Sequence, residues 1–348
     1  MKILALPRDP NPYQRLLYGE LARHGAAVRY VGDLTPSRTL NLLALPLELA
    51  ACRARGWRVL HVHWVFGFQV PGAGRLPVLR RVAQAWFVAV LWVAARLGLK
   101  IVWTAHNVLP HERVFHDDVA ARRALVRASD LVVLHSAQTR DALAGIGAPP
   151  RRSAVVPPGP FDAAVDAGAL PAPGSGAGRR RLLFFGKVIA YKGVEELLAA
   201  VERVPGVELT VAGECTDPAL RARLGELAGD RVALRLEHIP DGEVTALFAA
   251  ADAVVLPFRR VTTSASALLA MAHGRPVVLP DLPAFADLPA GAVVRYDGST
   301  GDLARVLAEL GGWPASRLAQ VGAGAAAHVS QLSWAGAATR TMAALREG

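Results

Sequence analysis

The chain has 348 residues, of which 52% are hydrophobic and 20% are charged, and its formal net charge is +10. This length predicts about two domains, and the composition excludes a disordered or collagen-like protein. The two cysteines stand far apart in the sequence, so we expect no disulfide framework and a reducing, cytoplasmic compartment. The amino terminus begins on an apolar run and lacks the layout of a signal peptide.

The excess of positive charge lies entirely in the first half of the chain. Residues 1–165 contain 21 Lys and Arg against 10 Asp and Glu, or +11, and residues 166–348 contain 18 against 19, or −1. A basic half can face an anionic membrane surface, an acidic substrate or nucleic acid, or can simply be solvated. We find no nucleic-acid recognition motif, so nucleic acid is not an expected partner.

Apolar runs and helical stretches alternate through the first half. Strands are predicted at 2–6, 26–31, 58–62, 100–104, 130–134 and 153–156, and helices at about 12–24, 38–55, 76–97, 117–128 and 137–145. This rhythm predicts a parallel sheet with helices on both faces.

One of these stretches, residues 82–95, carries no charge and contains Trp86, Phe87 and Trp92 between arginines. It is shorter than the roughly 20 residues that cross a bilayer. It is therefore either a buried helix or a helix that lies at a membrane interface.

The second half repeats the pattern after an Ala/Gly/Pro/Ser-rich linker at 166–181. Strands are predicted at 182–185, 207–212, 232–236, 253–256, 276–279 and 292–295, and helices at 193–203, 217–227, 241–250, 264–273 and 300–310. A final helix near 335–346 has no strand partner. The sequence thus predicts domains at 1–165 and 182–328, with residues 329–348 packing back on the first. Two such sheets place their ligands at the carboxyl ends of the strands, in a cleft.

The turn that follows the strand at 182–185 is the most informative stretch of the chain. Gly186 and Lys187 come directly after the strand, and Lys192 and Gly193 precede a helix. Two of the chain's four lysines fall in this window. Cations beside a helix N-terminus suit a diphosphate. The alternative is a solvated turn with two surface lysines.

These residues belong to a set of motifs that resembles a known family. The set comprises 186–193, 211–214, 247–257 and 270–278 in the second half, and 61–64, 104–112 and 156–159 in the first. Their order and spacing resemble the GT-B glycosyltransferases, especially retaining glycosyltransferase family 4. The resemblance implies two Rossmann-like domains facing a cleft, an acceptor domain first and a nucleotide-sugar domain second.

The resemblance also implies a set of donor-binding residues. In the family, residues at the positions of Lys187 and Lys192 bind the diphosphate. The implied donor-binding set is Gly186, Lys187, Lys192, Gly213, Glu214, Thr262, Thr263, Ser264, Ala265 and Ser266. Two family glutamates that bind sugar and ribose align with Val261 and Leu269, which cannot hydrogen-bond through their side chains. We expect phosphate binding to persist and sugar recognition to differ.

The first half supplies the remaining candidates. His106 follows the strand at 100–104, where a family histidine contacts the donor sugar, and we place it with Lys187 and Lys192 as catalytic. His61 and His63 share one face of their strand, either toward the cleft or in packing. The acceptor-binding candidates are Asn11, Pro12, Tyr13, His63, Asn107 and Glu112. We expect no metal and no cofactor beyond a UDP- or GDP-linked sugar.

The predicted activity is transfer of a sugar from a nucleoside-diphosphate sugar to an acceptor hydroxyl, with retention of configuration. The acceptor is a saccharide, a lipid-linked saccharide or a small molecule such as a natural product. Two alternatives stay open: a sugar-nucleotide epimerase or hydrolase on the same fold, and an inactive nucleotide-sugar-binding scaffold. The location is the cytoplasm or the inner face of the plasma membrane, on anionic lipid.

Overall fold

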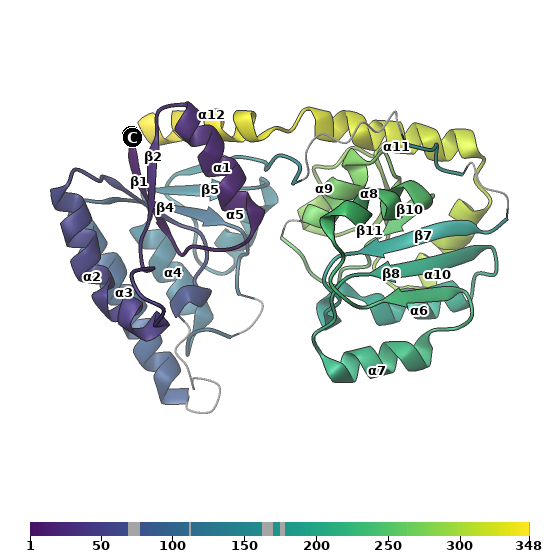
Figure 1. Ribbon diagram of the computed structural model, residues 1–348, viewed down its shortest axis with the longest axis horizontal. Helices are drawn as coiled ribbons and strands as arrows, with labels where there is room; N and C mark the ends of the chain where they lie inside the picture. Colours follow the sequence, from purple (N-terminus) through teal and green to yellow (C-terminus); the bar gives the residue numbers. More distant parts are fainter. Residues whose placement is uncertain (69–76, 111–112, 162–169, 175–177, 263, 348) are drawn as a thin grey trace. The chain divides into compact units, whose positions relative to one another are not determined.

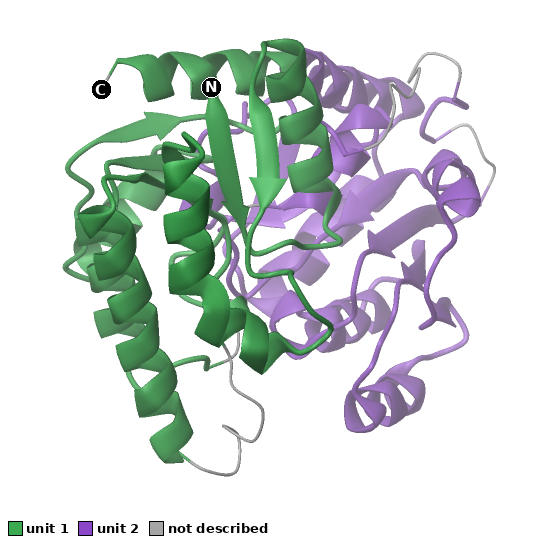
Figure 2. Ribbon diagram, turned by 60° about the vertical axis from the view of Figure 1, so that its left-hand side comes forward, with its two compact units in different colours: residues 1–159, 333–348 green, residues 160–332 purple. Residues whose placement is uncertain are grey.

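The computed structural model describes residues 1–68, 77–110, 113–161, 170–174, 178–262 and 264–347. The chain forms two compact units, residues 1–159 with 333–348 and residues 160–332 (Figure 2). Each unit has a separate hydrophobic core. Cys52 is buried in the first unit and Cys215 in the second, and both are free.

Unit 1 is a doubly wound α/β domain (Figure 1). In the described part of unit 1, six parallel strands are arranged in the order β2-β1-β3-β4-β5-β6. The strands are β1 (Lys2–Leu6), β2 (Ala27–Tyr30), β3 (Val59–Val62), β4 (Lys100–Ala105), β5 (Leu131–Leu134) and β6 (Ser153–Val155). The helices are α1 (Pro12–Arg23), α2 (Arg38–Ala54), α3 (Pro77–Arg96), α4 (Asp118–Ala128) and α5 (Gln138–Gly145), with the short η1 (Phe66–Phe68). Because β1 leads to β2 on one side and β2 to β3 on the other, right-handed crossovers place α1 and α2 on opposite faces.

Unit 2 repeats this plan with strand order β12-β11-β10-β7-β8-β9, again all parallel within the residues described. Its strands are β7 (Arg180–Phe185), β8 (Val207–Ala212), β9 (Val232–Arg235), β10 (Ala253–Val255), β11 (Val277–Pro280) and β12 (Val293–Tyr296). Its helices are α6 (Val194–Glu202), α7 (Pro218–Leu227), α8 (Asp241–Ala250), α9 (Ala265–Ala272), α10 (Thr300–Gly311) and α11 (Ala315–Ser330), with η3 (Ala190–Lys192) and η4 (Pro283–Phe285). The predicted fold of two doubly wound parallel sheets is confirmed.

Helix α12 (Trp334–Arg346) returns the end of the chain to unit 1, as predicted. It begins at the N-cap Ser333, packs on α1, and also contacts β5 and β6. Lys100 Nζ donates a hydrogen bond to the Leu345 carbonyl at 2.9 Å, and Arg152 donates to the Ala344 carbonyl. The last helix is therefore a part of the first domain's fold.

Helix α11 was not predicted; eight of its 16 residues are alanine or glycine, and glycine is a poor helix former. It packs against α9. A Cβ at Gly322 would lie 2.1 Å from the Gly274 carbonyl oxygen, and one at Gly324 would lie 2.6 Å from that of Gly291. Two glycines thus allow the helix to touch backbone directly.

Candidate functional site

The lysine turn of unit 2 brings together three side-chain or backbone groups that were predicted to bind a donor. Gly186 follows β7 with φ +126°, and a Cβ there would lie 2.7 Å from Ser266 Oγ and 3.0 Å from Lys192 Nζ. A hydroxyl and an ammonium therefore converge over bare backbone. Gly213 follows the neighbouring strand β8, and a Cβ on it would lie 2.1 Å from the Gly186 carbonyl oxygen. Both positions require glycine.

Glycine is also required at the end of the turn. Gly193 has φ +72°, and a Cβ there would lie 2.0 Å from the Pro257 carbonyl oxygen. This close approach holds η3 and the start of α6 against the segment that follows β10. The turn places Lys192 beside the Phe258 ring, with Nζ 5.7 Å from its centroid.

Lys192 is a half-buried cation. Burial, and then the charge of Lys187, lower its pKa to about 8. Across the described chain its ammonium has no carboxylate or hydrogen-bond partner. An unneutralised ammonium in a low-dielectric turn is an attractive site for an anion.

Lys187 is placed differently. Its side chain is 72% exposed, and its Nζ lies 3.6 Å from a carboxylate oxygen of Glu214. The Glu214 carbonyl accepts a hydrogen bond from the Val188 amide at 2.8 Å, which ties the two loops together. Lys187 adds positive charge to the turn, but in this structure its ammonium is paired with the Glu214 carboxylate.

The N-terminus of α9 supplies hydrogen-bond donors beside Lys192. Ser264 is the N-cap, and its hydroxyl accepts from the Ala267 amide at 3.1 Å. The amides of Ala265 and Ser266 have no acceptor among the residues that the structure describes. Thr262 is half-buried, and Thr263 lies outside the described residues. Two amides, one hydroxyl and one half-buried ammonium are thus grouped in one place, and groups of these kinds are suited to an anion.

The two positions of the family glutamates are apolar in space as well as in sequence. Leu269 is only 8% exposed and belongs to the unit 2 core, and Val261 packs against that core. Neither side chain can bind a sugar or ribose hydroxyl. Nearby, Arg259 forms an ion pair with Glu196, and Arg260 lies over the Tyr191 ring at 5.6 Å.

In unit 1 the structure joins four histidines and two hydroxyls into one hydrogen-bonded row, which we call the histidine chain. Thr104 Oγ1 lies 2.7 Å from His61 Nε2, and His61 Nδ1 lies 3.1 Å from the Tyr18 hydroxyl. That hydroxyl lies 2.6 Å from His63 Nε2. His63 Nδ1 lies 3.0 Å from His106 Nε2, His106 Nδ1 lies 3.3 Å from His135 Nε2, and His135 Nδ1 lies 3.2 Å from the Val156 carbonyl oxygen.

The carbonyl at the end of the histidine chain determines every tautomer in it. A carbonyl can only accept, so His135 Nδ1 carries a proton and its Nε2 accepts from His106 Nδ1–H. His106 Nε2 then accepts from His63 Nδ1–H, and His63 Nε2 accepts from the Tyr18 hydroxyl. Tyr18 in turn accepts from His61 Nδ1–H. With all four imidazoles neutral, every hydrogen bond points the same way.

Burial explains why the histidine chain stays neutral. Desolvation lowers the pKa of His61 to about 3, and that of His135 to about 4. It also lowers the pKa values of His63 and His106 well below the usual range, with the neighbouring histidines acting in the same direction. Burial therefore favours the neutral form of all four rings near neutral pH.

His106 lies at the carboxyl end of β4, as predicted, but both of its ring nitrogens are already engaged. Its face stacks on Trp64 with centroids 4.2 Å apart and an interplanar angle of 12°. A sugar hydroxyl can reach His106 Nε2 only by displacing His63. The contact between His106 and a donor sugar therefore stays a prediction. It requires that a sugar hydroxyl replace His63 as the hydrogen-bond partner of His106 Nε2.

Of the predicted acceptor residues, His63 belongs to the histidine chain and Tyr13 packs against it, and others have local structural roles. Tyr13 is buried edge-on against His106 at 4.6 Å and against Trp334 at 5.0 Å. Asn11 caps α1, accepting from the Tyr13 amide at 3.0 Å, and Pro12 is the first residue of α1. Asn107 is half-buried in the loop after β4. Glu112 lies outside the described residues.

Sequence reasoning missed Tyr18 and His135 and gave His61 and His63 little weight. His135 was detectable, because it directly follows β5 just as His106 follows β4. Tyr18 was not, because a tyrosine on the buried face of a helix looks like ordinary core. The cluster is a row of hydrogen bonds and does not converge on a point. No three His, Cys, Asp or Glu side chains in the described ranges are placed to hold a metal ion.

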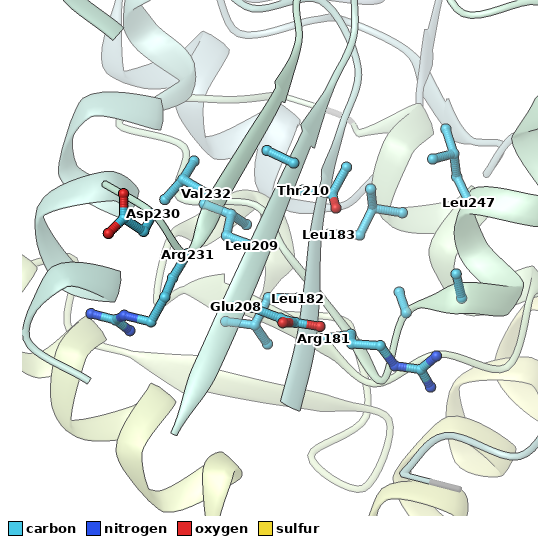
Figure 3. Close-up of a pocket in the computed structure, with 13 residues that line it drawn as sticks. Arg181, Leu182, Leu183, Glu208, Leu209, Thr210, Asp230, Arg231, Val232 and Leu247 are labelled. Carbon is cyan, nitrogen blue, oxygen red and sulfur yellow. The ribbon is translucent and has the colours of Figure 1, made fainter. Parts of the chain in front are cut away.

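A hollow of about 350 Å³ lies elsewhere in unit 2 (Figure 3). It is lined by Arg181, Glu208 and Arg231 near the amino ends of β7, β8 and β9, so it lies at the edge opposite the lysine turn. Its cations have partners within the protein: Arg181 pairs with Asp252 at 2.9 Å, and Arg231 donates to the Val207 carbonyl at 3.1 Å. It takes no part in the candidate site.

Comparisons with known proteins agree with the motifs. A family model described as Glycosyltransferase Family 4 matches residues 2–160, and one described as Glycosyl transferases group 1 matches residues 179–311. The D-inositol 3-phosphate glycosyltransferase of Corynebacterium aurimucosum is 30% identical, over 88% of this chain and 77% of its own length. The GDP-mannose:glycolipid 4-beta-D-mannosyltransferase of Xanthomonas campestris pv. campestris is 29% identical, over 64% of this chain and 61% of its own.

A solved structure shares the fold over the whole chain. Anabaena Alr3699/HepE in complex with UDP has a TM-score of 0.75 and 17% identity, covering 100% of both chains. The same protein has also been solved with UDP-glucose, and that structure gives a TM-score of 0.72.

Proposed function

The chain belongs to glycosyltransferase family 4, and we propose that this glycosyltransferase takes its sugar from a UDP- or GDP-linked donor, whose diphosphate unit 2 binds at the lysine turn. The observation that carries the proposal is the half-buried Lys192 ammonium, which has no ion-pair or hydrogen-bond partner among the described residues, beside Ser266 and the bare Gly186 backbone. The Anabaena neighbour holds UDP or UDP-glucose, and the Xanthomonas relative is named for GDP-mannose, which supports both nucleotides as candidates.

The proposed chemistry is stabilisation of a leaving group. The bond between the anomeric carbon and the diphosphate oxygen breaks, the acceptor hydroxyl oxygen bonds to that carbon, and its proton leaves. Negative charge grows on the diphosphate. Lys192, the Ser266 hydroxyl and the amides of Ala265 and Ser266 would stabilise that charge in a site already arranged for it. These groups would supply the role that a divalent metal has elsewhere, so we propose a metal-independent reaction.

Unit 1 is proposed to bind the acceptor, a saccharide, a lipid-linked saccharide or a small molecule. The loop at Asn11–Tyr13 and the loop after β4 both follow carboxyl ends of strands, where ligands of such sheets bind. The neutral histidine chain would hold Tyr13 and His106 in one arrangement beside that site. We place the reaction in the cytoplasm because both cysteines are free. Retention of configuration is proposed on the family resemblance alone.

A second candidate is an inactive nucleotide-sugar-binding scaffold, which the apolar Val261 and Leu269 favour. Turnover separates the two. The protein is incubated with UDP- and GDP-sugars and with either D-inositol 3-phosphate or a bacterial glycolipid extract, and release of free nucleotide is measured. Acceptor-dependent release that Lys192→Ala abolishes supports the transferase, and the anomeric proton coupling of the product tests retention. Nucleotide binding without release from any donor supports the scaffold.

A further inference from the structure

Two helices of unit 1 expose large apolar side chains to solvent. Among the described residues, seven of the ten exposed large hydrophobic side chains lie on α2 and α3. We call this set the α2–α3 face: Leu40, Leu43 and Leu47 on α2, and Val78, Val82, Val88 and Trp92 on α3. Leu47 is 77% exposed and Trp92 is 58% exposed. A patch of this kind on one side of a monomer marks an interaction surface.

The two helices present these side chains on a common side. α2 packs on α3 (Figure 1). The Trp86 indole of α3 donates to the Leu42 carbonyl of α2 at 3.0 Å. Leu40, Leu43 and Leu47 are spaced by three and four residues and so share one helix face. The opposite faces of both helices are in the core, through Leu45, Leu49 and Cys52 of α2 and Phe87, Val90 and Ala94 of α3. The α2–α3 face therefore points away from the domain.

Judged by length and composition alone, helix α3 could cross a membrane. Only 28% of the 18-residue stretch that meets this test is buried. It cannot span a bilayer and keep this fold, because Phe87 and Leu91, 1% and 3% exposed, are packed in the unit 1 core between α2 and α4. A helix with one face in a protein core and an apolar face outward can lie only along an interface.

The charge around the α2–α3 face identifies the partner. Residues 34–100 contain nine Lys and Arg and one acidic residue, Glu48. Glu48 is buried and accepts from the Gly32 amide, so it does not offset the surface charge. Arg96 lies over the Trp92 ring at 5.0 Å, and Arg81 is exposed beside Val82. A second copy docked face to face would bring the same cations together, and nucleic acid would leave the leucines in water.

From this combination we propose that the α2–α3 face docks on an anionic lipid bilayer, with the apolar side chains inserted and the arginines on the headgroups. The inference goes beyond the transfer reaction, because docking needs only the outer sides of two helices in unit 1. The sequence predicted only that the basic first half of the chain could face an anionic membrane. The proposal assigns the membrane contact to seven side chains, three of which lie on α2, a helix that the sequence analysis had not singled out.

Vesicle sedimentation tests the proposal. The full-length protein is mixed in 50 mM salt with phosphatidylcholine vesicles that contain either 40% or no phosphatidylglycerol. Leu43→Ser/Leu47→Ser removes apolar contact at exposed positions, so the fold is kept, and Arg81→Gln/Arg96→Gln removes the charge of the two exposed arginines beside Val82 and Trp92. Leu227→Ser is the matched control, because Leu227 is 47% exposed on α7 of unit 2. Light scattering reports the oligomeric state of each variant, and calorimetry with UDP or GDP reports the donor site separately.

We expect the wild type to sediment only with the anionic vesicles and the control to behave like it. The leucine variant should bind at least tenfold more weakly, and the arginine variant roughly thirtyfold more weakly, since each cation near such a surface contributes about fivefold. A wild type that stays in the supernatant with anionic vesicles overturns the proposal. So does a dimer that Leu43→Ser/Leu47→Ser dissociates, which would assign the face to a second copy. Neither result bears on nucleotide binding, so failure of the transferase proposal is distinguishable.

Discussion

Acidification should destabilise unit 1 through its histidine chain. In the folded state the pKa values of all four imidazoles lie below 6.5, the ordinary value for a solvated histidine. The unfolded chain therefore binds more protons than the folded chain at any pH between the folded values and 6.5. Stability is complete above pH 6.5 and falls as the pH drops below it.

The magnitude follows from the two values that can be stated, about 3 for His61 and about 4 for His135. A histidine that stays neutral in the fold loses about 1.4 kcal/mol per pH unit, so each of these two loses about 2 kcal/mol between pH 6.5 and pH 5. Together they lose about 4 kcal/mol, and His63 and His106 act in the same direction. This is a large share of the roughly 5–15 kcal/mol by which a domain is stable.

Urea unfolding at pH 7.5, 6.5, 5.5 and 5.0, followed by tryptophan fluorescence, measures this dependence. Six of the seven tryptophans lie in unit 1, so the signal reports that unit. We expect the free energy of unfolding to fall by at least about 2.7 kcal/mol per pH unit below pH 6, from two protons taken up. His61→Gln should reduce this slope by about 1.4 kcal/mol per pH unit, because one proton is no longer taken up.

The slope, and not the absolute stability, is the decisive quantity, since any buried substitution lowers stability. His24→Gln is the matched control, because His24 is an exposed histidine of unit 1 that does not belong to the histidine chain. A wild-type slope near zero between pH 6.5 and 5 would refute the reasoning. It would mean that the four rings are protonated or solvated in the native state.

Three further predictions concern unit 2. Because burial and Lys187 lower the pKa of Lys192 to about 8, nucleotide affinity measured by calorimetry should be constant below pH 8 and fall toward tenfold per pH unit above it; Lys192→Arg should remove that dependence, and an unchanged dependence in this variant would contradict the assignment. Gly193→Ala should lower the free energy of unfolding by about 3 kcal/mol or more in calorimetric melting, because Gly193 has a left-handed φ and a Cβ would clash with Pro257. Gly206→Ala is the control, because a Cβ there meets nothing within 4 Å. Equal melting points for the two variants would count against the packing described. Asp252→Ala should lower the free energy of unfolding by about 3–5 kcal/mol, because Asp252 is 2% exposed and accepts from Arg181 and the Gly174 amide. If this loss were as small as that caused by Glu243→Ala, at an exposed residue, the ion pair of Asp252 with Arg181 would be dispensable.

Much of the fold was predictable because the signals are local. Short apolar runs such as 2–6 and 131–134 are buried on both faces of parallel sheets, and the structure has strands there. Helix α11 escaped prediction because it contains two glycines, which disfavour a helix in the sequence and here allow close approach to other backbone. The exposed leucines of α2 escaped because a leucine-rich helix looks like core until its packing partners are known.

The candidate site divides in the same way. The lysine turn was recognisable because Lys192, Gly193 and the start of α9 have local motifs. The structure adds that Ser266 Oγ and Lys192 Nζ both lie beside the bare backbone of Gly186. The histidine chain was only partly predictable. Its members come from α1, β3, β4 and the loops after β3, β4 and β5, and only the sheet order β1-β3-β4-β5 brings them together. The assigned roles of these residues in catalysis remain predictions.

Calorimetric titration of UDP, GDP and ADP into the wild type and into Lys192→Ala tests the central claim most directly. We predict that one nucleotide binds the wild type and that the variant loses at least tenfold in affinity, about 1.4 kcal/mol. Lys187→Ala should lose less, because Lys187 is exposed and shared with Glu214. Nucleotide affinity that is unchanged by Lys192→Ala, or binding of none of the three, would contradict a donor site at the lysine turn.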